Sequence, residues 1–76
     1  MEIKFFNAKW CGPCKQMKPH IDELISEGYN IQSIDVDEQP ELAQQFNVRG
    51  VPTLVVNGNS LVGYRDKSQI KEAVGG

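Results

Sequence analysis

Hydrophobic and polar residues along the 76-residue chain alternate between strand-like and helix-like patterns. Four short apolar runs bounded by turn residues are typical of strands. They cover residues 3–7, 31–36, 53–56 and 60–64. In three other segments the apolar residues recur at helical spacing, which predicts helices. These segments cover residues 13–27, residues 40–46 and the stretch that follows residue 66.

Single residues mark where these elements begin, bend or end. Asn47 can take the left-handed conformation that ends a helix. Asn57-Gly58 between two apolar runs is the strongest short signal for a β-hairpin. Asp66 and Gln69 form a D-x-x-Q pattern, which predicts a capping box at the start of the last helix. Pro19 falls inside the first helix and removes one backbone hydrogen bond, so we expect a kink there.

The element order is therefore β-α-β-α-β-β-α. Strands joined through a helix pair in parallel, and a hairpin adds an antiparallel strand. We expect an α/β fold with a four-stranded mixed sheet flanked by helices on both faces. Residues 1–76 should form a single domain, since any smaller piece would lack a core of its own.

The distribution of charge narrows the classes of function. The formal net charge of −2 argues against nucleic-acid binding, which needs a basic face. Lys9, Lys15 and Lys18 nevertheless gather near the two cysteines. The first residues do not form a signal peptide, and no apolar run approaches the ~18 residues of a membrane span. We therefore expect a cytoplasmic monomer with no membrane partner.

Cys11 and Cys14 are the only cysteines of the chain, and they open the first predicted helix. Residues three positions apart on a helix lie about 5–6 Å apart, within reach of a disulfide. The N-terminus of a helix favours an anion, which lowers the pKa of a cysteine and makes a reactive thiolate. Cys14 lies on the apolar stripe of the helix, whereas Cys11 precedes it. We expect Cys11 to be the exposed nucleophile and Cys14 to be the buried thiol that resolves the mixed disulfide.

Two structural interpretations of the cysteine pair fit less well. A structural zinc site takes four ligands, but the cysteines are joined only by His20 among the usual nitrogen and sulfur ligands. We expect no metal, and His20 to be a surface residue. A purely structural disulfide that closes so short a loop would remove little chain entropy. The pair is therefore interpreted as catalytic, with modest electrostatic support from Lys9 and Lys15.

The segment Trp10-Cys11-Gly12-Pro13-Cys14-Lys15 resembles the active-site signature of the thioredoxin family. Arg49-Gly50-Val51-Pro52-Thr53 is similar to the loop that carries the cis-proline of that family. Further matches in family order are Pro19, residues 37–40, Asn57-Gly58 and Gly63. The resemblance covers nearly the whole chain and implies a minimal thioredoxin-like fold.

The resemblance also implies how a client protein would bind. Pro52 would be cis and packed against the two cysteines. The backbone of Val51 would hydrogen-bond an extended client segment in the manner of a β-strand. The remaining residues expected to contact the client form a rim around the cysteines: Trp10, Gly12, Pro13, Gly50 and Gly63.

Three features depart from the family pattern. The chain begins at the strand before the cysteines, so we expect the minimal core that glutaredoxins also have. Phe5 stands where thioredoxins carry a buried aspartate, and Ser33 where the lysine partner of that aspartate would stand. The resemblance implies that in thioredoxins this aspartate deprotonates the buried cysteine. Because this chain has Phe5 instead, it cannot deprotonate its buried cysteine in that way. Asp35 on the neighbouring strand is a possible replacement.

Together these features predict a protein dithiol–disulfide oxidoreductase that needs no bound cofactor. Its electrons would come from a flavoenzyme of the thioredoxin-reductase type and pass to client proteins with disulfides. One alternative is a glutaredoxin-like enzyme that uses glutathione, although Gly12-Pro13 and the sequence after the hairpin differ from the glutaredoxin motifs. The other alternative is a non-catalytic binding module, in which the cysteines would be dispensable.

Overall fold

A four-stranded mixed sheet forms the centre of the protein in the computed structural model, which describes residues 2–75. Its strands are β1 (Glu2–Asn7), β2 (Asn30–Asp35), β3 (Thr53–Val56) and β4 (Asn59–Val62). They lie in the order β2-β1-β3-β4. β1 pairs with β2 in parallel, and the other two pairings are antiparallel. The predicted fold class is confirmed.

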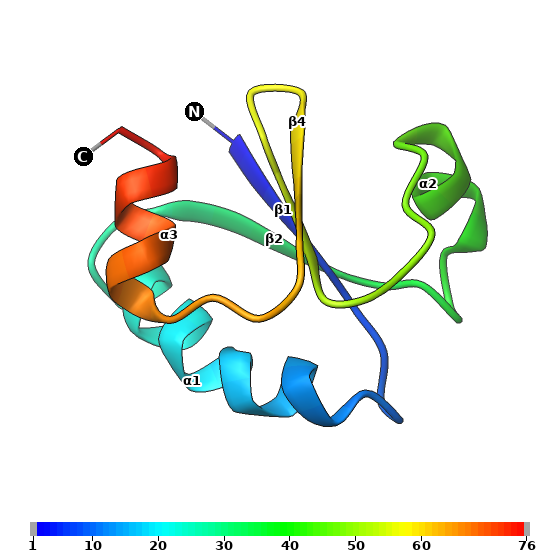
Figure 1. The fold of residues 1–76 in the computed structure, drawn as a ribbon, viewed down its shortest axis with the longest axis horizontal. Helices are drawn as coiled ribbons and strands as arrows, with labels where there is room; N and C mark the ends of the chain where they lie inside the picture. Colours follow the sequence, from blue (N-terminus) through cyan, green and yellow to red (C-terminus); the bar gives the residue numbers. More distant parts are fainter. Residues whose placement is uncertain (1, 76) are drawn as a thin grey trace.

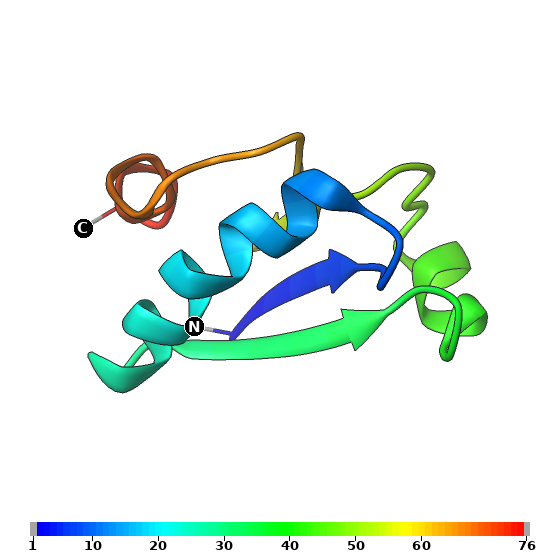
Figure 2. The ribbon, with the colours of Figure 1, turned by 90° about the horizontal axis from the view of Figure 1, so that it is seen from below.

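Helices cover both faces of this sheet, as Figures 1 and 2 show. They are α1 (Gly12–Ser26), α2 (Pro40–Gln45) and α3 (Lys67–Ala73). α1 and α3 pack on one face, and α2 packs on the other. No helix within residues 2–75 has the length and apolar character needed to cross a membrane.

The two adjacent phenylalanines of β1 connect the sheet to both layers, because successive side chains on a strand point to opposite faces. Phe5 joins the cluster on the α1 side, which includes Met17 and Leu24. Phe6 joins the cluster on the α2 side and packs against Phe46, with ring centroids 6.0 Å apart. β1 is therefore buried on both faces, as a central strand must be.

The structure confirms several of the element ends that local sequence signals predicted. Asn47 has a φ of 58° after α2, and Asn57 has a φ of 51° in the β3–β4 hairpin. At the start of α3, the Asp66 side chain accepts the N–H of Gln69, and the Gln69 side chain accepts the N–H of Asp66. The last strand was predicted to reach residue 64 but ends at Val62, because Gly63 turns the chain with a φ of 102°.

A group of ion pairs links α3 to α1. The Lys67 ammonium lies 3.2 Å from a carboxylate oxygen of Glu23 and also contacts Glu27. The Lys71 ammonium lies 3.2 Å from Glu27. Hydrogen bonds from Lys67, and then from Lys71, hold the pKa of Glu27 below its ordinary value of 4.5. The pKa of Lys67 is raised in turn, chiefly by its hydrogen bond to Glu27.

Candidate active site

The two cysteines lie where the chain leaves β1 and enters α1. Their Cα atoms are 5.2 Å apart, and their sulfur atoms form a disulfide. The predicted spacing is confirmed, since the first helical turn brings the two side chains together. The pair can therefore exist as a disulfide without any rearrangement of the surrounding backbone.

Hydrogen bonds at the helix N-terminus converge on Cys11, which is the N-cap residue of α1. The backbone N–H of Cys14 donates to the Cys11 sulfur at 3.2 Å, and the N–H of Lys15 donates to the Cys11 carbonyl. These N–H groups lie at the positive end of the helix dipole. A negative charge that appears on the Cys11 sulfur is therefore stabilised where it forms.

The expectation that Cys11 is exposed was wrong for the disulfide form. Cys11 is 4% exposed and Cys14 is 3% exposed, so the two residues are equally buried. Both pack with Ala8 in a small cluster that Val36 and Val51 cover. The sequence did not reveal this because Val36 and Val51 come from segments distant from the cysteines along the chain. Cys14 was predicted to be buried, and that is confirmed.

The predicted rim residues on the helix side lie at the surface. Trp10 is 69% exposed, and its indole Nε1 donates a hydrogen bond of 2.8 Å to the Asp37 carboxylate. Gly12 and Pro13 are exposed in the first turn of α1. The orientation of the indole is therefore fixed by a residue that follows β2.

The other rim residues come from the loop before β3 and from the end of β4. The Val51–Pro52 peptide bond is cis, as the resemblance implied. Pro52 is buried, and its carbonyl accepts the N–H of Gly63 at 2.9 Å, which joins the two segments. Gly50 accepts a hydrogen bond of 2.7 Å from the Thr53 hydroxyl. A hollow of about 120 Å³ lies beside this loop, lined in part by Trp10 and Val51.

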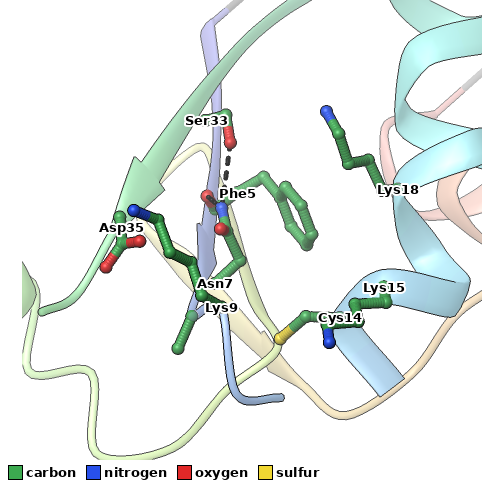
Figure 3. Close-up of a pocket in the computed structure, with 9 residues that line it drawn as sticks. Phe5, Asn7, Lys9, Cys14, Lys15, Lys18, Ser33 and Asp35 are labelled. Carbon is green, nitrogen blue, oxygen red and sulfur yellow. Dashed lines mark hydrogen bonds between the residues drawn. The ribbon is translucent and has the colours of Figure 1, made fainter. Parts of the chain in front are cut away.

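A second cavity, of about 460 Å³, reaches Cys14 from the side of β1 and β2. Figure 3 shows the Cys14 sulfur turned toward the group of residues that lines it. These residues are Phe5, Asn7, Ala8, Lys9, Cys14, Lys15, Lys18, Ser33 and Asp35. Its lining brings together the two positions that depart from the family pattern, since Phe5 and Ser33 are direct partners in the parallel register of β1 and β2.

Polar groups in this cavity are tied to the backbone and to one another. The Asn7 amide donates to the Ser33 hydroxyl at 2.9 Å and to the Ile34 carbonyl at 3.2 Å. Asp35, a possible base for Cys14, has one carboxylate oxygen that accepts the N–H groups of Asp37 and Glu38, at 2.8 Å and 3.3 Å. Sequence reasoning missed Asn7. Asn7 could have been found from the predicted parallel pairing of the first two strands, because this pairing places the end of the first strand beside the second.

Two residues weighed from the sequence lie outside the site or at its margin. The His20 ring nitrogen Nε2 lies 3.1 Å from the Tyr64 hydroxyl, and neither lines the cavity beside Cys14. Lys9 lines that cavity but also lies 3.5 Å from the Glu38 carboxylate. Within residues 2–75, no three His, Cys, Asp or Glu side chains are grouped as they would be to hold a metal ion.

A family model, related sequences and a solved structure all relate this chain to thioredoxins. The sequence model of the thioredoxin family matches residues 3–75. A thioredoxin from Staphylococcus saprophyticus is 39% identical over 77 residues, which cover 91% of this chain and 74% of that protein. A bifunctional thioredoxin reductase/thioredoxin from Mycobacterium leprae is 43% identical over 54 residues, covering 67% of this chain and 12% of that protein. The solved structure of a mutant thioredoxin from Halobacterium salinarum superposes with a TM-score of 0.87 at 37% identity, covering 96% of this chain and 70% of that one.

Proposed function

The chain belongs to the thioredoxin family and is a thiol–disulfide oxidoreductase, and from this premise we propose that Cys11 is the nucleophile and Cys14 the resolving thiol. One observation carries this assignment. The Cys11 sulfur accepts the Cys14 N–H at the start of α1, whereas Cys14 lies within the first turn, on the face that packs on the sheet. Only the Cys11 sulfur is therefore placed to be stabilised as a thiolate by the helix N-terminus.

The proposed reaction transfers two electrons from the reduced protein to a client disulfide. The Cys11 thiolate attacks one sulfur of the client, so that a mixed disulfide forms and the other client sulfur leaves as a thiolate. Cys14 then loses its proton and attacks the Cys11 sulfur. The mixed disulfide breaks, the second client thiolate leaves, and the Cys11–Cys14 disulfide forms. The 5.2 Å between the Cα atoms supports this closing step.

The client is proposed to bind as an extended segment along Val51. Among the described residues, no turn or loop hydrogen bond between backbone groups involves Val51, and this residue packs against the cluster that contains the two cysteines. Its backbone can therefore pair with a client strand. The proposed rim around this position consists of Trp10, Gly12, Pro13, Gly50 and Gly63. The small residues among them allow the client backbone to approach closely, and Pro52 holds the end of the loop beside the cysteines.

The reductant is proposed to be a flavoenzyme of the thioredoxin-reductase type, acting in the cytoplasm, where thiols are kept reduced. The similarity to a bifunctional protein named for both thioredoxin reductase and thioredoxin supports this choice. A coupled assay tests it by offering the oxidised protein either NADPH with thioredoxin reductase or glutathione with glutathione reductase. Faster turnover with the flavoenzyme is expected. Efficient and saturable turnover with glutathione alone would contradict the proposal.

The division of roles between the cysteines is tested by trapping. Cys14→Ser should accumulate a mixed disulfide with an oxidised client, because the nucleophile remains and the resolving thiol is gone. Cys11→Ser should trap almost none, although it retains one thiol in the same cluster. Each variant therefore serves as the control for the other. A mixed disulfide that forms through Cys14 at a comparable rate would reverse the assignment.

A further inference from the structure

The cavity beside Cys14 offers a way to deprotonate this residue that depends on no buried acid. This inference rests on the proposed role of Cys14 as the resolving thiol, because Cys14 must become a thiolate before it can attack the mixed disulfide. Cys14 is 3% exposed and lies beside Phe5 and Ala8 in the cavity wall. Apolar surroundings disfavour the charged form of a thiol. Some feature of the site must offset that penalty.

Charged side chains enter the cavity from three directions. Lys15 and Lys18 come from α1, Lys9 comes from the segment after β1, and Asp35 comes from the end of β2. Val36 and Val51, which pack against the cluster that contains Cys14, carry no charge. Three lysines and a single aspartate therefore line the cavity. The balance is positive in a protein whose formal net charge is −2.

The Asp35 carboxylate and the lysine ammonium groups have different contacts and would have opposite effects on a Cys14 thiolate. One carboxylate oxygen of Asp35 is engaged by two backbone N–H groups of the following turn. Among the described residues, no hydrogen bond joins Asp35 to Cys14. The Lys9 ammonium lies 3.5 Å from the Glu38 carboxylate and the Lys18 ammonium 3.5 Å from the Asp22 carboxylate, and all four side chains are exposed to solvent. The charge of Asp35 would oppose a thiolate on Cys14, whereas the lysines would favour one.

We propose that water in the cavity reaches the Cys14 sulfur and removes its proton, and that Lys15 and Lys18 stabilise the resulting thiolate while Asp35 opposes it. In this step the proton passes from the Cys14 sulfur to water in the cavity. The thiolate electron pair then forms the bond to Cys11, and the client thiolate leaves and is protonated by solvent. A volume of about 460 Å³ is ample for several water molecules.

The expected effect of each charge is modest. For charges separated by about 8–10 Å in a water-like medium, Coulomb's law predicts a shift of about 0.3–0.4 pH unit in the apparent pKa. Removing both lysines should therefore raise the apparent pKa of Cys14 by about 0.6–0.8 pH unit. Removing the Asp35 charge should lower it by about 0.3–0.4 pH unit. High salt should reduce all three shifts, because the groups are accessible to solvent.

The test titrates Cys14 in the reduced Cys11→Ser protein, in which position 11 carries no charge, as in the mixed disulfide. The ultraviolet absorbance of the thiolate reports its fraction at each pH. The variants are Lys15→Met, Lys18→Met, the double variant and Asp35→Asn. The matched control is Lys71→Met, which removes a helix lysine that does not line the cavity. Methionine and lysine have similar helix propensities, and the asparagine introduced by Asp35→Asn keeps an oxygen that can accept the same two N–H groups.

The outcomes separate the possible roles of these charges. Upward shifts for the cavity lysines, a downward shift for Asp35→Asn and no shift for Lys71→Met are expected. Lysine shifts no larger than that of Lys71→Met would overturn the proposal. It would also be overturned if Asp35→Asn slowed client release in the protein with both cysteines, because Asp35 would then be the base. Lys18→Gln provides a second neutral replacement if Lys18→Met perturbs folding.

Failure of this inference is distinguishable from failure of the proposed roles. If Cys14 were not the resolving thiol, Cys14→Ser would not accumulate a mixed disulfide, whatever the titration showed. If Cys14 resolves but the lysines have no influence, trapping would succeed and the titration curves of the variants would coincide. The two experiments therefore contradict different statements.

Discussion

Replacing Phe5 with aspartate should destabilise the protein and change how its activity depends on pH. Phe5 is 2% exposed and pairs with Leu54 and Ser33 in the centre of the sheet. Losing a buried phenyl ring costs about 3–5 kcal/mol, and burying a carboxyl group adds about 1–3 kcal/mol. A domain of this size has a total stability of about 4–11 kcal/mol. Because the cavity supplies water and Lys18 beside position 5, we expect a loss of about 4 kcal/mol, at the lower end of the summed costs.

This loss is measured first, by urea unfolding. With a slope of about 1 kcal/mol per M, a loss of about 4 kcal/mol lowers the midpoint by about 4 M. Phe6→Asp is the matched control, because Phe6 is equally buried but lies on the α2 face, away from Cys14. Phe5→Asp should be destabilised less than Phe6→Asp, because Phe5 lines the cavity beside Cys14 and Phe6 does not. Equal losses would show that the cavity does not hydrate position 5.

The pH dependence is then measured under conditions where the variants are folded. In the natural protein, single-turnover client release should quicken between about pH 6 and pH 8, as the Cys14 thiolate becomes populated. Burial raises the pKa of a carboxyl group, so an aspartate at position 5 would accept the Cys14 proton near neutral pH. Phe5→Asp should therefore flatten the profile, and Phe6→Asp should not. A natural protein with an already flat profile would refute the reasoning, because another group must then accept the proton.

Three further predictions concern stability. Asp66→Ala removes the side chain that accepts the Gln69 N–H, and should lower the free energy of unfolding by about 1 kcal/mol in urea titrations. Gly58→Ala forces a residue with a Cβ into a φ of 80° and should cost about 1–2 kcal/mol, whereas Gly58→Asn should cost less. The lowered pKa of Glu27 means that its ion pairs stabilise the fold above pH 4.5 and lose this contribution as the pH falls through the folded-state value. Lys67→Met should therefore weaken the dependence of the thermal midpoint on pH in acid, and an unchanged dependence would show that the pair is not coupled to folding.

The elements of the fold were predictable because each has a local cause. The Asn57-Gly58 turn, the capping box at Asp66 and the left-handed Asn47 all act within a few residues along the chain. Strand ends were less predictable, since they depend on where pairing stops. Apolar spacing also does not guarantee burial, since Ile25 shares the helical spacing of the buried residues of α1 and is nevertheless exposed.

The site was predictable in its chemistry but not in its surroundings. The spacing and the position of Cys11 and Cys14 indicated a disulfide at a helix N-terminus, and the structure has one there. The burial of Cys11 could not be predicted, because it depends on contacts with two valines far along the chain. The cavity beside Cys14 was missed for the same reason. Its wall combines side chains from β1, α1 and β2, and only the register of the two strands brings them together.

The central claim, that Cys11 and Cys14 act in sequence on one client disulfide, is tested most directly by counting the thiols released. The reduced protein is mixed with an excess of a disulfide-bonded client, and free client thiols are measured per protein molecule by mass spectrometry. The natural protein should release both thiols of one disulfide and end with its own disulfide formed. Cys14→Ser should release one thiol and keep the client attached at Cys11, and Cys11→Ser should release none. Release of both thiols by either single-cysteine variant would contradict the account.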